Sequence, residues 1–217
     1  ILVPSNFVKN SFNKKDWNKI EVLNFGVNTQ NFFRNKNIKK SQKYFDILFI
    51  GAISLRKGLQ YLIEAFHKLK HPNKRLHIVG YHTLDKGFFE NKIKNDKIIF
   101  YGYVNHYKLN ELINKSHVFV LPSIEEGFAT VILQATAAGC PVIVSENTGA
   151  SEFVKNNTVG YSVPIRNSEA ITNKLEILAG SKILLNELSQ KAEKTMQDNT
   201  WSHYVDQLDE LILKLKK

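Results

Sequence analysis

The sequence predicts an α/β fold in which helices cover both faces of a Rossmann-like parallel sheet. Short apolar runs, such as residues 45–51, alternate along the chain with amphipathic segments, such as residues 57–70, and the connections between them are short. Strands that are apolar on both sides are buried on both faces, and their regular alternation with helices is typical of parallel sheets. Five successive units agree on this fold class.

The individual elements follow from the same periodicity. In the first amphipathic segment the apolar side chains recur every three or four residues, which places them on one helix face. They are Leu59, Leu62, Ile63, Phe66 and Leu69. The full pattern predicts strands at 45–51, 75–80, 97–102, 117–121 and 140–145, and helices at 57–70, around 88–94, at 107–115 and at 130–138.

The two ends of the chain do not follow this repeat. The first residues read as a strand followed by a helix with Ser5 at its N-cap, and a second strand then runs into a loop around Gly26. From Ser168 onward we expect helices, with Trp201 at the start of the last one. The chain does not begin with methionine, and its one methionine is Met196. We therefore expect it to be a piece of a longer protein.

Composition and cysteine content indicate the compartment. A chain of 217 residues with 43% hydrophobic side chains can bury a core of its own. No apolar run approaches the roughly 18 residues that a membrane span requires, and the N-terminus carries no signal-peptide pattern. The one cysteine, Cys140, opens an apolar strand, so we expect a small buried core residue. A single cysteine permits no internal disulfide, which suits a reducing cytoplasm.

The formal net charge of +10 raises the question of an anionic partner. The lysines are spread over 32–45, 68–75, 92–97 and the C-terminal end, without the arginine stripe or the aromatic–basic repeat of nucleic-acid modules. A solvated basic surface is the first explanation. Peripheral contact with an anionic membrane leaflet or glycolipid is the second. Nucleic acid is the least favoured, and we expect no such partner.

The histidines do not predict a metal site. All seven are dispersed along the chain, and none has the spacing of metal ligands. His77 and His117 fall in predicted strands, where we expect them to pack rather than to bind a ligand. We therefore expect no metal.

The most informative run is residues 122–145. An apolar strand ends before Pro122, an acidic turn with Glu126 and Gly127 follows, and a helix of small residues closes at Gly139. The next apolar strand begins at once. A carboxylate and a glycine thus stand at the entrance of a helix, where unpaired N–H groups and the positive end of the helix dipole favour an anion.

This run resembles the motif of the retaining nucleotide-sugar glycosyltransferases of family 4, which have the GT-B fold. The residues that match the motif are Glu126, Gly127, Phe128, Ala135, Ala137, Gly139, Pro141, Val142 and Ile143. Two positions depart from it, since Ala129 stands for the second glycine of the motif and Gln134 for its second glutamate. The resemblance covers nearly the whole chain but only the C-terminal half of a GT-B enzyme.

Two cations follow the first strand of the repeat and complete the candidate site. Arg56 and Lys57 come shortly after Gly51, and ligands of open α/β sheets bind at the edge where the strands end. The spacing fits neither a P-loop nor a dinucleotide fingerprint. Cations at the positive end of a helix are unfavourable unless an anion lies between them. The family commonly has an arginine directly after the strand glycine; Ala52 occupies that place here, so Arg56 is the candidate substitute.

The resemblance assigns roles to these residues. The diphosphate of a UDP-, GDP- or ADP-sugar would lie against Arg56 and Lys57, with Gly51 beside them. Glu126 would accept hydrogen bonds from hexose hydroxyls, whereas its neighbour Glu125 is expected to be a solvated loop acid. Arg56, Lys57 and Glu126 are therefore the candidate catalytic residues.

The remaining donor contacts are expected from three further places. The N–H groups of the turn at 127–130 would hold the diphosphate from its other side. The residues of that turn are Gly127, Phe128, Ala129 and Thr130. Gln134 would replace the family carboxylate at the ribose hydroxyls, because an amide accepts one hydrogen bond and donates another. Tyr103 and Val104 are expected near the base.

The resemblance also divides the chain and implies a function. Residues 1–34 correspond to the end of an N-terminal acceptor domain and its linker, residues 35–195 to the nucleotide-sugar donor-binding domain, and residues 196–217 to a C-terminal crossover helix. The whole enzyme would be a hexosyltransferase of polysaccharide or lipopolysaccharide synthesis, cytoplasmic at the inner membrane face and without a metal cofactor. Its glycan or glycolipid acceptor would bind through the missing N-terminal domain, so we expect the fragment alone to be inactive. A non-catalytic, degenerate sugar-nucleotide-binding module remains the alternative, because Ala129 and Gln134 depart from the motif.

Overall fold

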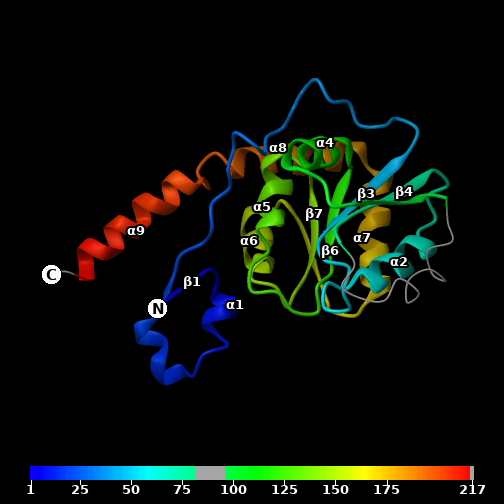
Figure 1. The fold of residues 1–217 in the computed structure, drawn as a ribbon. Coiled ribbons are helices and arrows are strands. Elements are labelled where there is room, and N and C mark those ends of the chain that lie inside the picture. The colour runs from blue at the N-terminus through cyan, green and yellow to red at the C-terminus, as the bar shows by residue number, and fades with distance from the viewer. Residues whose placement is uncertain (82–95, 216–217) are drawn as a thin grey trace.

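A six-stranded parallel sheet forms the centre of the molecule (Figure 1). The computed structural model describes residues 1–81 and 96–215. The strand order is β5-β4-β3-β6-β7-β8, and every neighbouring pair is parallel, so all strands end at the same edge. The strands are β3 (Phe45–Ile50), β4 (Lys74–Val79), β5 (Ile98–Gly102), β6 (Val118–Leu121), β7 (Val142–Ser145) and β8 (Gly160–Val163).

Helices cover both faces of this sheet. The chain moves in opposite directions from β3 and β6, and right-handed crossovers therefore place α2 on one face and α5 and α6 on the other, as Figure 1 shows. Helix α7 packs against α2, and α8 packs against α5. The helices are α2 (Leu59–Lys68), α4 (His106–Lys115), α5 (Thr130–Ala137), α6 (Ala150–Asn157), α7 (Ser168–Gly180) and α8 (Lys182–Thr195).

The two ends of the chain lie outside this core. A two-stranded parallel sheet and short helices form the N-terminal part, and helix α9 extends away from the sheet toward the C-terminus (Figure 1). Their bounds are β1 (Leu2–Val3), α1 (Asn6–Lys9), the 3-10 helix η1 (Lys14–Lys19), β2 (Glu21–Val22) and α9 (Trp201–Leu215). No helix within the described residues is long and apolar enough to cross a membrane.

The structure confirms the predicted fold class and the elements on which it rested. Ile47, Leu48 and Phe49 of β3 have no exposed surface, as a strand covered on both faces requires. All five predicted strands are present, and the predicted Ser5 cap exists, because the Ser5 hydroxyl accepts from the N–H of Val8 at 3.2 Å. The helix expected around 88–94 lies outside the described residues.

Two elements of the sheet domain were not predicted, helix α6 and strand β8, and the 3-10 helix η1 of the N-terminal part was not predicted either. Helix α6 contains serine and two asparagines, which are weak helix formers. Strand β8 is four residues long and lies at the edge of the sheet, and three of its residues are only partly buried. Neither segment therefore carries the long apolar periodicity from which the other elements were recognised. Cys140, in contrast, is fully buried and free, as predicted.

Candidate functional site

Two turns come together at the edge where the strands end. The first, residues 51–58, follows β3, and the second, residues 122–129, follows the neighbouring strand β6. Their backbones are bonded directly, since the N–H of Ile124 donates to the carbonyl of Arg56 at 2.8 Å. The parallel sheet thus brings together the two segments that the sequence singled out.

Gly58 allows this close approach. It has φ +72°, and a Cβ at this position would lie 1.9 Å from the carbonyl oxygen of Pro122. Only glycine combines that backbone conformation with that contact. Gly58 is also the N-cap of α2. Gly58 was not predicted to belong to the site, because the predicted helix at 57–70 included it, whereas α2 begins only at Leu59.

A charged cluster forms between the two turns. The ammonium of Lys57 is ion-paired with the carboxylate of Glu126, and both side chains are only 14% exposed. The Lys57 side chain passes Gly51, where its Cδ lies 3.8 Å from the position that a Cβ would take. Arg56 is 55% exposed, and its guanidinium lies 3.4 Å from Glu126 Oε2 while donating to the Glu125 carbonyl at 2.9 Å. The structure therefore places Arg56, Lys57 and Glu126 in one cluster, to which Glu125 contributes its backbone.

A third turn, after β7, fixes the acidic turn in place. The N–H of Glu126 donates to the Asn147 carbonyl at 3.1 Å, and the N–H of Gly149 donates to the Glu126 carbonyl at 3.0 Å. From the N-terminal part, the Ser5 hydroxyl donates to the Gly127 carbonyl at 2.9 Å. The supporting roles of Ser5, Asn147 and Gly149 were not predicted. Gly149 could have been found, because it lies in the turn that follows the predicted strand at 140–145.

The entrance of α5 offers backbone donors. Ala129 is the N-cap, and it has no side chain able to cap the helix; the first turn of α5 carries no acidic residue. Phe128 and Ala129 are buried, and Phe128 packs edge-on against Phe25 at 5.9 Å between ring centroids. Thr130 is exposed. The N–H groups of this turn can therefore accept an anion without displacing a capping side chain.

The other predicted residues lie further from the charged cluster. Gln134 is half-buried one turn into α5, and its side chain makes no hydrogen bond with the described residues. Tyr103 and Val104 follow β5, which β4 separates from β3. Tyr103 is 85% exposed, and Val104 packs in part against the core. Within the described chain no hydrogen bond, ion pair or ring contact joins these two residues to the cluster.

The chain matches a known family over most of its length. The model of the family "Glycosyl transferases group 1" matches residues 29–195. An uncharacterized glycosyltransferase of Methanocaldococcus jannaschii, MJ1607, is 33% identical over 165 residues, which are 71% of this chain and 42% of that protein. CapM of Staphylococcus aureus, a capsular polysaccharide biosynthesis glycosyltransferase, is 28% identical over 204 residues, which are 87% of this chain and 53% of that protein.

A solved structure agrees with this match. Anabaena Alr3699/HepE, solved in complex with UDP and with UDP-glucose, is 15% identical, and its UDP complex superposes with a TM-score of 0.86 over 98% of this chain and 63% of that one. The chain spans about half the length of the curated relatives above, 42% and 53%. From the family match, the relatives and the shared fold, we conclude that this chain belongs to the group 1 glycosyltransferases and that its sheet is a Rossmann-like domain of the GT-B fold.

Proposed function

We propose that the chain is the donor-binding domain of a retaining glycosyltransferase, which transfers a hexose from a UDP-, GDP- or ADP-sugar to a glycan or glycolipid. The observation that carries this proposal is the cluster of Arg56, Lys57 and Glu126 at the edge where the strands end. Ligands of open α/β sheets bind at this edge. The cluster pairs cations suited to a diphosphate with a carboxylate suited to sugar hydroxyls.

The diphosphate would lie between Lys57 and the entrance of α5. Its oxygens would accept hydrogen bonds from the Lys57 ammonium, from Arg56 and from the N–H groups of the turn at 127–130. As the bond to the sugar breaks, negative charge develops on the leaving diphosphate. Fixed cations and backbone donors stabilise that charge without reorganisation, which is where most of the rate acceleration would arise.

Glu126 would exchange partners when the donor binds. In the structure its carboxylate is ion-paired with Lys57. As Lys57 turns to the diphosphate, the carboxylate becomes available to accept from hexose hydroxyls. Gln134 would hold the ribose, and Tyr103 and Val104 would contact the base. The complexes of the Anabaena protein with UDP and UDP-glucose support a uridine nucleotide as the first donor to test.

The acceptor would bind across the cleft in the other half of the enzyme. We infer a cytoplasmic enzyme of polysaccharide or lipopolysaccharide synthesis, which works at the inner face of the membrane and needs no metal. The role of CapM in capsular polysaccharide biosynthesis supports this class of product. The rival proposal is a degenerate module that binds a sugar nucleotide without transferring the sugar, and Ala129 and Gln134 favour it.

Calorimetric titration of the chain with UDP, GDP and ADP tests the donor assignment. We expect weak binding of one nucleoside diphosphate and no turnover, because half of the cleft is absent. Failure of all three to bind would contradict the donor site. For a longer protein that includes the acceptor half, proton NMR of the product gives the anomeric configuration. Retention supports the enzyme, and nucleotide binding without any transfer supports the degenerate module.

A further inference from the structure

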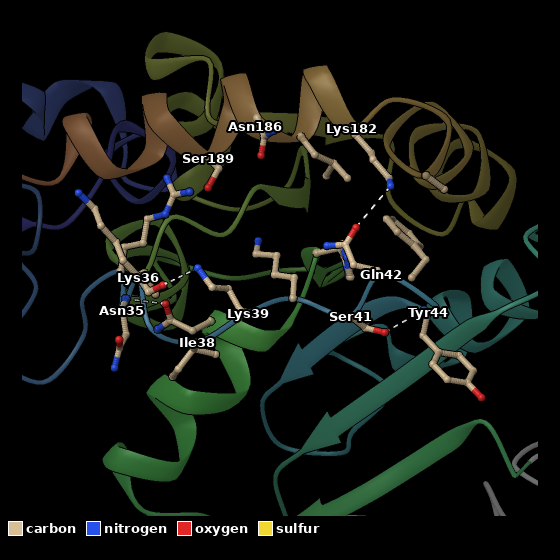
Figure 2. A pocket seen from close by; sticks show the side chains of 18 of the residues that line it. Asn35, Lys36, Ile38, Lys39, Ser41, Gln42, Tyr44, Lys182, Asn186 and Ser189 are labelled. Carbon is tan, nitrogen blue, oxygen red and sulfur yellow. Dashed lines mark hydrogen bonds between the residues drawn. The ribbon is translucent and has the colours of Figure 1, made fainter.

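A cavity of about 790 Å³ lies at the opposite edge of the sheet from the Lys57–Glu126 cluster. Phe45, the first residue of β3, and His117, which directly precedes β6, both line it. Six residues of a strand span about 17 Å, so the length of β3 separates this cavity from the donor site. Its walls are the segment 34–45 and one side of α8, which face each other in Figure 2.

The cavity wall is strongly basic. The described lining includes one carboxylate, Glu193, which is bonded to a guanidinium at 3.2 Å. Helix α8 begins in the wall and has no acidic residue in its first turn, so its dipole adds positive potential. Figure 2 shows Lys39 and Lys182 reaching in from the two walls. The six cations that line the cavity are Arg34, Lys36, Lys39, Lys40, Lys43 and Lys182.

One cation of the cavity lacks a partner. Lys40 is half-buried, and none of the described residues forms a hydrogen bond or an ion pair with its ammonium. Burial lowers the pKa of Lys40; Cys140 opposes this shift, and Arg34 adds to it. Burying an unpaired charge is costly, and an anion in the cavity would give the Lys40 ammonium a partner.

A basic surface that water simply solvates would look different. Solvated lysines point outward from a convex surface, where salt screens them. Here six cations line a hollow of about 790 Å³, within the roughly 300–1,000 Å³ range of small-molecule sites. A carboxylate brings a single charge to such an excess of cations. A phosphate brings a charge of about −1.5 to −2 and three acceptor oxygens.

We propose that this cavity is a second anion site, which binds the phosphate group of a ligand other than the donor sugar nucleotide. The Lys40 ammonium contacts the phosphate at the inner end of the cavity, and Lys39, Lys43 and Lys182 hold it from the mouth. The same phosphate chemistry occurs in soluble phosphorylated metabolites and in lipid headgroups. The proposal is independent of transferase activity, because no residue of the donor cluster takes part.

The test is a titration of the chain with inorganic pyrophosphate. Binding is monitored through the imidazole signals of His71 and His117 in carbon–proton NMR spectra. These side chains line the cavity, so their signals separate binding here from binding at Lys57. We expect saturable shifts of both signals. Lys40→Gln should weaken this binding at least about tenfold, the loss expected for a charged hydrogen bond. Lys191→Gln removes the same charge from an exposed position on α8 that does not line the cavity. It should change the affinity for pyrophosphate by no more than about twofold.

Three results would overturn the proposal. They are unmoved signals of both histidines, equal weakening by Lys40→Gln and Lys191→Gln, and loss of the shifts in Lys57→Ala. If Lys40→Gln does not fold, Lys182→Gln at the exposed start of α8 repeats the test, and it should weaken pyrophosphate binding about threefold.

Co-sedimentation with vesicles that contain phosphatidic acid then identifies the source of the phosphate group. Vesicle binding that Lys40→Gln abolishes and Lys191→Gln preserves assigns the site to a headgroup; binding of pyrophosphate but not vesicles assigns it to a soluble ligand.

Discussion

Lys57 and Glu126, which are 69 residues apart in the sequence, form an ion pair across the edge of the sheet. The resemblance implied different partners for them, a diphosphate for the lysine and a hexose for the glutamate. In the structure each is the partner of the other. Both side chains are only 14% exposed, and a largely buried charge that loses its partner is destabilised. The pair therefore keeps two charges in place until a donor supplies better partners.

Replacing Lys57 tests the diphosphate contact. Lys57→Ala should weaken nucleoside diphosphate binding by about 1.5 to 3 kcal/mol, the range for losing a charged hydrogen bond. The unpaired Glu126 carboxylate would also repel the diphosphate, which favours the upper part of that range. Affinity for the uncharged nucleoside should hardly change. Calorimetry with both ligands measures the difference, with Lys191→Ala as control; equal losses for both ligands would contradict the assigned contact.

Replacing Glu126 should have the opposite signature. Glu126→Ala frees Lys57, so the affinity for the free diphosphate should stay level or rise slightly. The affinity for the intact sugar nucleotide should fall relative to the affinity for the free diphosphate, because the hexose hydroxyls lose a hydrogen-bond acceptor. Titrating the same protein with UDP and with UDP-glucose gives the ratio of the two constants. An unchanged ratio would show that Glu126 does not contact the sugar.

Gln134 tests whether the ribose contact survives in this chain. Gln134→Glu introduces a charged acceptor for two hydroxyls, and it should tighten nucleoside diphosphate binding by about 1 kcal/mol. The Gln134 side chain makes no hydrogen bond with the described residues, so the change breaks no existing hydrogen bond there. Calorimetry with UDP or GDP measures it. A neutral or weakened result would favour the degenerate module over a working transferase.

The sequence was informative where local pattern determines structure. The apolar periodicity of β3 and β6 and the glycine-containing turns after them predicted both halves of the site. That the two turns face each other was predicted, since both were placed against the same diphosphate. The direct ion pair of Lys57 with Glu126 was not predicted, because the resemblance gave each of them a ligand as its partner. The contact of Gly58 with Pro122 was missed, because it depends on how closely the turns after β3 and β6 approach each other. The basic cavity was missed too, since its cations come from the segment 34–45 and from α8.

Gly58 should be intolerant of a side chain. Gly58→Ala places a Cβ where the Pro122 carbonyl lies and forces an L residue into φ +72°. A left-handed non-glycine residue alone costs of the order of 1 to 3 kcal/mol, and the backbone clash adds to it. Urea unfolding should show at least this loss, together with weaker nucleotide binding. Gly180→Ala is the matched control, because a Cβ there meets nothing within 4 Å. A loss no larger than in the control would show that the two turns can separate freely.

His117 should make the stability of the fold depend on pH. Its Nδ1 accepts a hydrogen bond from the N–H of Asp46 at 3.0 Å, and its side chain is only 13% exposed. Burial lowers the pKa of His117 from 6.5 to about 4, and Lys40 acts in the same direction. The Asp46 carboxylate, 3.9 Å from Nδ1, opposes the shift. His71, which also faces it, lowers the pKa further.

The sign follows from proton binding. Between pH 6.5 and about 4 the unfolded chain binds a proton at this site and the folded chain does not, so the free energy of unfolding falls as the pH falls through this window. The whole shift corresponds to about 3 kcal/mol, and about 2 kcal/mol of it should be lost between pH 7 and pH 5. Urea unfolding at these two pH values measures the loss. His117→Gln removes the titrating group, and the loss should shrink by that amount relative to the unchanged chain. An identical loss in the variant would show that other groups cause the dependence and that His117 titrates normally in the folded chain.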